Sequence, residues 1–218
     1  MQSITRRLHG KPIHIIHPGE HFETGEDIAI GTLLGSCIAV AMYDPQTGVG
    51  GLNHFLLPNL RDPNVDYKSD DAGRYGVYAM AVLFNGLYAL GARRKNLRAK
   101  VFGGGHVLHG TSSGNVPESN IEFAFEFLEN EHIPVESHDV GGVQARKVYL
   151  FPASGKVLMK RFGGPRANSV EQGELSYLSK LRSFNPKGTG ARPNRPRNAT
   201  SRLQGQMQMP PKRVATHR

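Results

Sequence analysis

The sequence has only one cysteine, Cys37, among its 218 residues, and it has no long apolar segment. A single cysteine cannot form a disulfide within the chain. The longest unbroken apolar run, residues 77–84, is far shorter than the roughly 20 residues that a helix needs to cross a bilayer. These absences predict a protein of a reducing, cytoplasmic compartment that does not insert into a membrane.

The net charge of +9 is concentrated near the C-terminus. Residues 160–218 hold 13 Lys and Arg against Glu171 and Glu174, a balance of +11. Residues 1–159 hold 14 basic and 16 acidic residues, a balance of −2. Because the positive charge belongs to the C-terminal segment and not to the body, we do not predict a nucleic-acid-binding protein.

The composition predicts one globular domain, residues 1–164, followed by a basic extension, residues 165–218. From Phe184 onward the extension is rich in proline, glycine and polar residues, so it has too little apolar material to offset the entropy cost of ordering, and we expect it to be mostly disordered. Before it, residues 169–184 are expected to form one short helix with Leu175, Leu178 and Leu181 as a modest apolar stripe. The extension is expected to be too poor in apolar residues to pack across a functional site.

The hydrophobic periodicity of residues 1–162 alternates between strand and helix. Helices are expected over residues 70–89 and from a capping-box pattern at residues 119–122, the second with Ile121, Phe125 and Leu128 on one face. Strands outnumber helices, with runs at 38–43, 49–57, 97–102, 133–139, 147–151 and 156–162. We predict an α/β fold with a β-sandwich-like, largely antiparallel core flanked by helices, because a doubly wound parallel sheet would require a helix after every strand.

The turn sequence DPQTG, which starts at Asp44, separates a segment that begins at Cys37 from one that contains His54. If the two strands pair antiparallel across a four-residue loop, Cys37 lies directly opposite His54, with Cβ atoms about 5 Å apart. A five-residue loop would pair Cys37 with Phe55 instead. In the first register the imidazole could take the thiol proton and create a nucleophilic thiolate. The alternative is that Cys37 is a small buried apolar residue and His54 a hydrogen-bonded core residue.

Gly35 and Ser36 immediately precede the cysteine. Glycine permits a close approach of the backbone, and the amides around Cys37 could point at an oxyanion that develops during attack by the thiol. The sequence therefore predicts oxyanion or backbone support from Gly35 and Ser36.

The other motifs predict neither a cofactor nor a metal ion. The glycine run at 103–105 lacks the Lys and the Ser or Thr of a phosphate-binding loop, so it is interpreted as a turn. His14 with His17, and His106 with His109, have no nearby cysteine or obvious carboxylate partner, so solvated histidines are the simpler interpretation.

Several motifs, taken in order, resemble the chemoreceptor glutamine deamidase (CheD) family of bacterial chemotaxis. They are LGSC followed by IAV and YDP, GG followed by NHF and LP, HDVGG at 138–142 with Arg146, and GKVLMK at 155–160. The likeness covers roughly residues 10–162. It is carried by the order and the spacing of the motifs more than by any one of them.

The resemblance implies a cysteine hydrolase whose substrates are methyl-accepting chemotaxis receptors. Cys37 would attack the side-chain amide of a receptor glutamine, His54 would act as general acid and base, and water would cleave the thioester to leave glutamate. Thr32 is the natural match for a family threonine that orients the imidazole. The family fold is similar to that of deamidating bacterial toxins, and relatives bind a CheC-type chemotaxis phosphatase. The alternative is a non-enzymatic adaptor that binds receptors or such a phosphatase.

Overall fold

The computed structural model describes residues 7–57, 70–107 and 116–183. The chain divides into two compact units, Met1–Phe184 and Asn185–Arg218, and every described residue belongs to the first. The compact unit therefore continues about twenty residues beyond the boundary expected after Gly164. The disorder expected from Phe184 onward lies outside the described residues, and the separation of the basic extension as a functional unit stays a prediction.

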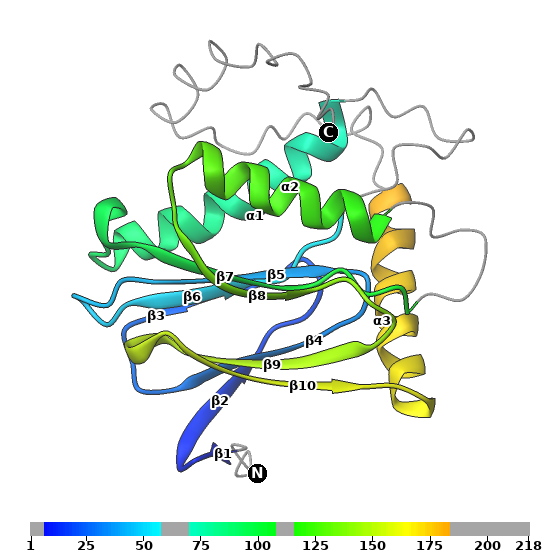
Figure 1. The fold of residues 1–218 in the computed structure, drawn as a ribbon, viewed down its shortest axis with the longest axis horizontal. Coiled ribbons are helices and arrows are strands. Elements are labelled where there is room, and N and C mark those ends of the chain that lie inside the picture. The colour runs from blue at the N-terminus through cyan, green and yellow to red at the C-terminus, as the bar shows by residue number, and fades with distance from the viewer. Residues whose placement is uncertain (1–6, 58–69, 108–115, 184–218) are drawn as a thin grey trace, which may run out of the picture. The chain divides into compact units, whose positions relative to one another are not determined.

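Two five-stranded sheets form the centre of the first unit. In one sheet the strands are ordered β1-β2-β4-β9-β10 and in the other β3-β6-β5-β7-β8, and among the described strands only the β2–β4 and β7–β8 pairs are parallel. The predicted sandwich-like, largely antiparallel core is thus confirmed (Figure 1). The strands are β1 Arg7–Leu8, β2 Lys11–Ile15, β3 His21–Thr24, β4 Ala29–Leu34, β5 Ile38–Tyr43, β6 Gly50–Asn53, β7 Arg98–Gly103, β8 Val135–Val140, β9 Ala145–Phe151 and β10 Lys156–Phe162.

Two apolar clusters hold the layers together. One lies between the sheets and joins residues such as Ile30, Ala39 and Leu150. The other lies between the second sheet and the helices α1 (Asp70–Ala89) and α2 (Val116–Asn130), which cover its outer face in Figure 1. None of the described helices combines the length and the apolarity that crossing a bilayer requires.

Helix α1 has the predicted bounds, whereas α2 starts three residues before the predicted capping box. Pro117 explains the earlier start, because its fixed backbone torsion suits the first turn of a helix. The fully buried stripe therefore runs along Val116, Asn120, Ala124 and Leu128, four residues apart. Of the face predicted from the sequence, Leu128 is buried, while Ile121 and Phe125 pack beside the cluster only partly buried.

A third helix, α3 (Pro165–Ser183), follows β10, and Figure 1 shows it in orange beside the ends of strands from both sheets. The sequence predicted a helix here, but the observed one begins four residues earlier. Val170, Leu178 and Leu181 are its buried apolar residues, whereas Leu175, predicted in the stripe, is 45% exposed.

The β5–β6 hairpin has a register that differs from both predicted ones. Asp44 pairs with Val49 through its amide, so the loop is 45–48 and not 44–47. The side chain of Asp44 fixes this turn by accepting the amide hydrogen of Gln46 at 2.8 Å. Ile38 consequently pairs with Phe55, which places neither His54 nor Phe55 directly opposite Cys37.

Candidate active site

Cys37 and His54 nevertheless lie on the same face of the β5–β6 pair. Because Ile38 is opposite Phe55, His54 and Cys37 are diagonal neighbours in the ladder, and residues two apart along a strand share a face. A ring nitrogen of His54, the Cys37 sulfur and a carboxylate oxygen of Glu174 lie within 4.8 Å of one another. The structure therefore brings the two predicted residues together through a diagonal contact.

Thr32, on β4, reaches His54 from the opposite sheet. Its Oγ1 lies 2.7 Å from His54 Nδ1 and 2.9 Å from the carbonyl oxygen of Ile16. The carbonyl can only accept, so the single hydroxyl proton of Thr32 goes to Ile16, and Nδ1 must donate to the hydroxyl oxygen. This arrangement leaves Nε2 as the unprotonated nitrogen of the neutral ring.

His54 Nε2 is buried and makes no hydrogen bond with any described residue. A buried imidazole nitrogen without a partner is unusual in a folded protein and requires a functional or structural reason. Beside a cysteine, an available lone pair of this kind is suited to accept the thiol proton.

The backbone around Cys37 forms a concave group of amides, here called the amide nest and made of the N–H groups of Gly35, Ser36 and Cys37. All three donate to the carboxylate of Glu174, at 2.7, 2.8 and 3.1 Å, and the hydroxyl of Ser36 donates to it at 2.7 Å. Gly35 and Cys37 donate to one carboxylate oxygen and Ser36 to the other, and amides grouped in this way stabilise a negatively charged oxygen. The predicted support from Gly35 and Ser36 therefore has a geometric basis.

The amide nest faces inward because its carbonyl groups are bound from the other side. Each of the three carbonyl oxygens accepts one hydrogen bond from outside the loop, and the donors are the amides of Gly105 and Gly104 and the side chain of Asn120. The amide of Gly105 donates to Gly35 at 2.6 Å and the amide of Gly104 donates to Cys37 at 2.8 Å. The side chain of Asn120 donates to Ser36 at 3.0 Å. Asn120 was not predicted, and its position on the buried stripe of α2 is the signal that could have identified it.

The glycine run at 103–105, interpreted from the sequence as a turn, has a more specific role. Gly103 has a φ of +115°, and a Cβ at this position would lie 2.1 Å from the carbonyl oxygen of Cys37. No other residue could occupy it without moving the cysteine loop. The run lets β7 end against the loop that carries Cys37.

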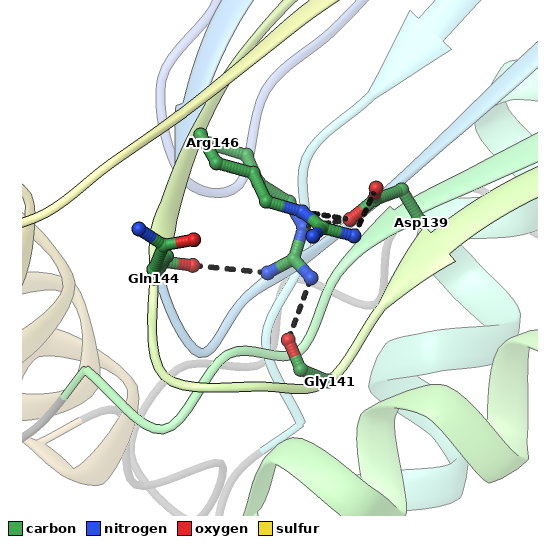
Figure 2. Close-up of polar contacts among 5 residues, drawn as sticks. Asp139, Gly141, Gln144 and Arg146 are labelled. Atoms are coloured by element: carbon green, nitrogen blue, oxygen red, sulfur yellow. Dashed lines mark hydrogen bonds and ion pairs between the residues drawn. The ribbon is translucent and has the colours of Figure 1, made fainter.

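Arg146, near the start of β9, supports this arrangement, as Figure 2 shows. Its buried guanidinium donates to Asp139 at 2.7 Å and to the carbonyl oxygens of Gln144 at 3.0 Å and Gly141 at 2.6 Å. Gly141 in turn donates its amide to the carbonyl of Gly103 at 2.9 Å. Arg146 and the 138–142 motif therefore position the glycine run, and they do not approach the thiol themselves.

Glu174 is the component that sequence reasoning missed. It comes from α3, it is 1% exposed, and its position contradicts the expectation that the segment after Gly164 is too poor in apolar residues to pack across the site. The sequence feature that could have identified Glu174 is its spacing. Glu174 is four residues from both Val170 and Leu178, so it lies on the apolar face of the helix. An acidic residue within an apolar stripe requires a buried partner.

Burial keeps both members of the Cys37–His54 pair uncharged in this arrangement. Desolvation raises the pKa of the Cys37 thiol well above its ordinary value, and the nearby carboxylate of Glu174 raises it further. Desolvation, followed by the charge of His17, lowers the pKa of His54 to about 3. The thiolate expected from the sequence is therefore disfavoured while Glu174 is in place.

Cys37, His54 and Glu174 also offer the soft and hard donors of a zinc site. The two carboxylate oxygens of Glu174, however, already accept four hydrogen bonds from the amide nest and Ser36. The donor set therefore does not favour a metal ion over the observed hydrogen bonds. Of the other histidines considered, His14 stacks on Phe22 at 3.8 Å and His106 pairs with Glu118, while His109 lies outside the described residues.

A cavity of about 300 Å³ opens beside His54. Residues of β3, the β6 end and α1 line it, and Tyr177 of α3 forms part of its wall. The cavity provides space for a substrate segment next to the imidazole.

Comparison with known proteins relates this site to a family. A family profile described as CheD chemotactic sensory transduction matches residues 56–161. The chain is 46% identical over 173 residues to the probable chemoreceptor glutamine deamidase CheD of Janthinobacterium sp. (strain Marseille). The aligned residues make up 79% of this chain and 85% of that protein. The protein of the same name from Herminiimonas arsenicoxydans gives the same identity and coverage.

A third relative, from Methylobacillus flagellatus, is 42% identical over 168 residues, with 77% of this chain and 83% of that protein covered. The chain belongs to the CheD family. The profile match to CheD begins after Cys37 and His54 in the sequence, so the roles of these two residues depend on the geometry described above.

Proposed function

We propose that this CheD-family protein hydrolyses the side-chain amide of specific glutamines on methyl-accepting chemotaxis receptors to glutamate, with release of ammonia. The observation that carries the proposal is the position of Cys37 between an imidazole with an unused lone pair and three convergent amides. The names of the relatives, chemoreceptor glutamine deamidases, support the choice of substrate. The single cysteine supports a cytoplasmic location, where thiols stay reduced.

In the first half of the reaction, Cys37 Sγ bonds to the carbonyl carbon of the substrate carboxamide while His54 Nε2 takes the thiol proton. The substrate oxygen gains negative charge and is held by the amide nest, in the place where the Glu174 carboxylate lies. The carbon–nitrogen bond then breaks, and His54 gives the proton to the leaving nitrogen, which departs as ammonia. The product of this half is a thioester between Cys37 and the substrate.

In the second half, water attacks the thioester carbon as His54 Nε2 takes a water proton. The carbon–sulfur bond breaks, the proton returns to the sulfur, and the substrate leaves as glutamate. Thr32 does not touch the substrate in this scheme. It is a positioning residue that keeps the proton on Nδ1 and so keeps Nε2 available.

A non-enzymatic adaptor that binds receptors or a CheC-type phosphatase is the second candidate. The observation that favours it is that Cys37 and His54 are fully buried and uncharged in this structure. The two functions are compatible, because a surface that positions a receptor segment for deamidation also binds it.

Incubation of the full-length protein with a receptor cytoplasmic fragment separates the two candidates. We expect ammonia release and conversion of glutamine to glutamate, abolished in Cys37→Ala and Cys37→Ser and reduced on the order of 10²- to 10⁴-fold in His54→Ala. His106→Ala is the matched control, because His106 is an exposed histidine outside the site. Substantial turnover by Cys37→Ala would refute the assignment, and binding without turnover by the wild type would favour the adaptor.

A further inference from the structure

Helix α3 closes the site in this structure. Cys37 has no exposed surface, His54 and Glu174 are each 1% exposed, and Leu178 of α3 joins the same apolar cluster as Cys37. A receptor side chain cannot reach the sulfur unless α3 moves away. The protein therefore needs at least one further conformation for any reaction on a second molecule.

The group that α3 places in the site has the chemistry of the reaction product. Deamidation of a glutamine yields a glutamate side chain, and the carboxylate of Glu174 occupies the amide nest with both oxygens hydrogen-bonded. Oε1 accepts from Gly35 and Cys37, and Oε2 accepts twice from Ser36. A carboxylate oxygen of Glu174 also lies within 4.8 Å of the Cys37 sulfur, so α3 holds a group of the product's chemical class beside the nucleophile.

Two glycines give α3 the space to approach. A Cβ on Gly35 would lie 2.7 Å from Oε2 of Glu174, and a Cβ on Gly19 would lie 2.6 Å from the hydroxyl oxygen of Tyr177. A larger side chain at Gly19 would push α3 away, and one at Gly35 would clash with Val107 as well as with Glu174. The two contacts involve Glu174 and Tyr177, which are three residues apart, so both lie within one turn of α3.

The anchoring of α3 suggests that it can be displaced. Its buried apolar residues are Val170, Leu178 and Leu181, while Leu175 is 45% exposed. Tyr177 and Ala167 pack partly buried against the neighbouring apolar clusters. A helix whose described part has only three fully buried apolar side chains and one buried carboxylate is a candidate for local opening at a free energy well below that of global unfolding.

We propose that the amide nest is a binding site for the side-chain carboxylate of a glutamate, and that α3 fills it with Glu174 as an intrachain competitor of the substrate. The identity of the substrate rests on the proposed function, whereas the competition rests on the contacts of α3. The partner that displaces α3 is a helix that presents a glutamine or glutamate with apolar residues four positions before and four after it, as Val170 and Leu178 flank Glu174.

The competition has a kinetic signature that a merely structural role would lack. If α3 and the receptor segment exclude one another, only the open protein binds the receptor. The apparent affinity for the receptor is then the affinity of the open protein multiplied by the fraction of protein that is open. Removal of the Glu174 carboxylate should then lower KM for the receptor fragment and leave kcat nearly unchanged. Loss of a catalytic group would instead lower kcat.

Alkylation of Cys37 by iodoacetamide tests the closure without any receptor. We expect the wild-type thiol to react slowly and the Glu174→Ala thiol to react at least about tenfold faster, because a thiol must be both accessible and deprotonated to react. Leu178→Ala, which loosens α3 and keeps Glu174, should also accelerate the reaction. Gln172→Ala, at an exposed position on the same helix, should stay within about twofold of the wild type.

Circular dichroism and thermal unfolding of each variant distinguish local opening from loss of the fold. Equal alkylation rates in wild type, Glu174→Ala and Leu178→Ala would overturn the inference, as would a lower kcat in Glu174→Ala with unchanged KM and unchanged alkylation. If the alkylation rates change as expected but no variant deamidates a receptor fragment, the proposed function fails and the closure by α3 stands. If the wild type deamidates but alkylation does not respond, only the closure fails.

Discussion

The Nδ1 atom of His54 lies 2.7 Å from the hydroxyl oxygen of Thr32, and that hydroxyl is itself committed to the carbonyl of Ile16. This pair of contacts fixes which ring nitrogen carries the proton, because the hydroxyl has one proton to give and the carbonyl can only accept it. The β4 strand of one sheet thereby sets the tautomer of a histidine held by the other sheet. The reactivity of Cys37 depends on this contact between layers.

The first prediction concerns Thr32. Thr32→Val keeps the shape of the side chain but removes the oxygen that receives the Nδ1 proton, so we expect the deamidation rate to fall on the order of tenfold or more. Thr32→Ser is the matched control, since it keeps the hydroxyl, and it should retain most of the rate. Kinetics on a receptor fragment measure both. Equal rates for the two variants would mean that the tautomer is set in another way.

The second prediction concerns acid stability. The pKa of buried His54 is about 3 in the folded chain against an ordinary value of 6.5, so below pH 6.5 the unfolded chain binds the proton more tightly. The contribution of neutral His54 is fully present above about pH 6.5 and is lost as the pH falls toward 3. Between pH 7 and 5 this loss is about 2 kcal/mol of unfolding free energy.

Urea unfolding at pH 7 and pH 5 measures that loss, and His54→Gln supplies the control. The variant lacks the imidazole whose pKa is shifted, so its unfolding free energy should fall less over the same interval. The ion-paired, half-buried carboxyl of Asp139 has a lowered pKa and stays ionised throughout that interval. Parallel pH profiles for wild type and variant would show that His54 is not the group responsible.

The third prediction concerns Arg146, which is almost fully buried and bonds to Asp139 and to two backbone carbonyls. Arg146→Met leaves these acceptors without their donor, so we expect a loss of about 3–5 kcal/mol of unfolding free energy. Arg161→Met is the matched control, because Arg161 pairs with the same Asp139 carboxylate from an exposed position. Its loss should be much smaller, and equal losses in urea unfolding would contradict the role assigned to burial.

The sequence was sufficient for much of the fold because local patterns determine it. The apolar run after Cys37, the turn at Asp44 and the periodicity of residues 70–89 each specify their element with few alternatives. The hairpin register was wrong because the side chain of Asp44 moves the loop by one residue, a tertiary detail that spacing alone does not show. Moving the loop by one residue changes the partner of each strand residue by two positions. Because residues two apart share a face, Cys37 and His54 stayed on one face.

The parts of the site that sequence reasoning missed come from distant segments. Asn120 is one residue in the stripe of α2, and Glu174 lies well over one hundred residues from the cysteine loop that it contacts. Such contacts arise from packing between layers, which no local pattern encodes. Glu174 did leave one trace, a carboxylate on the apolar face of its helix.

The most direct test of the account is Glu174→Gln, because it places a glutamine side chain against Cys37 and the amide nest within one molecule. We predict that the protein converts position 174 back to glutamate in cis, at a rate independent of protein concentration, as Cys37 attacks the new amide and water cleaves the thioester. Peptide mass spectrometry of residues 167–180 follows the conversion, with exposed Gln172 in the same peptide as an internal control that stays an amide. Adding Cys37→Ala should stop it. A folded Glu174→Gln protein that retains the amide at position 174, with Cys37 intact, would contradict the account.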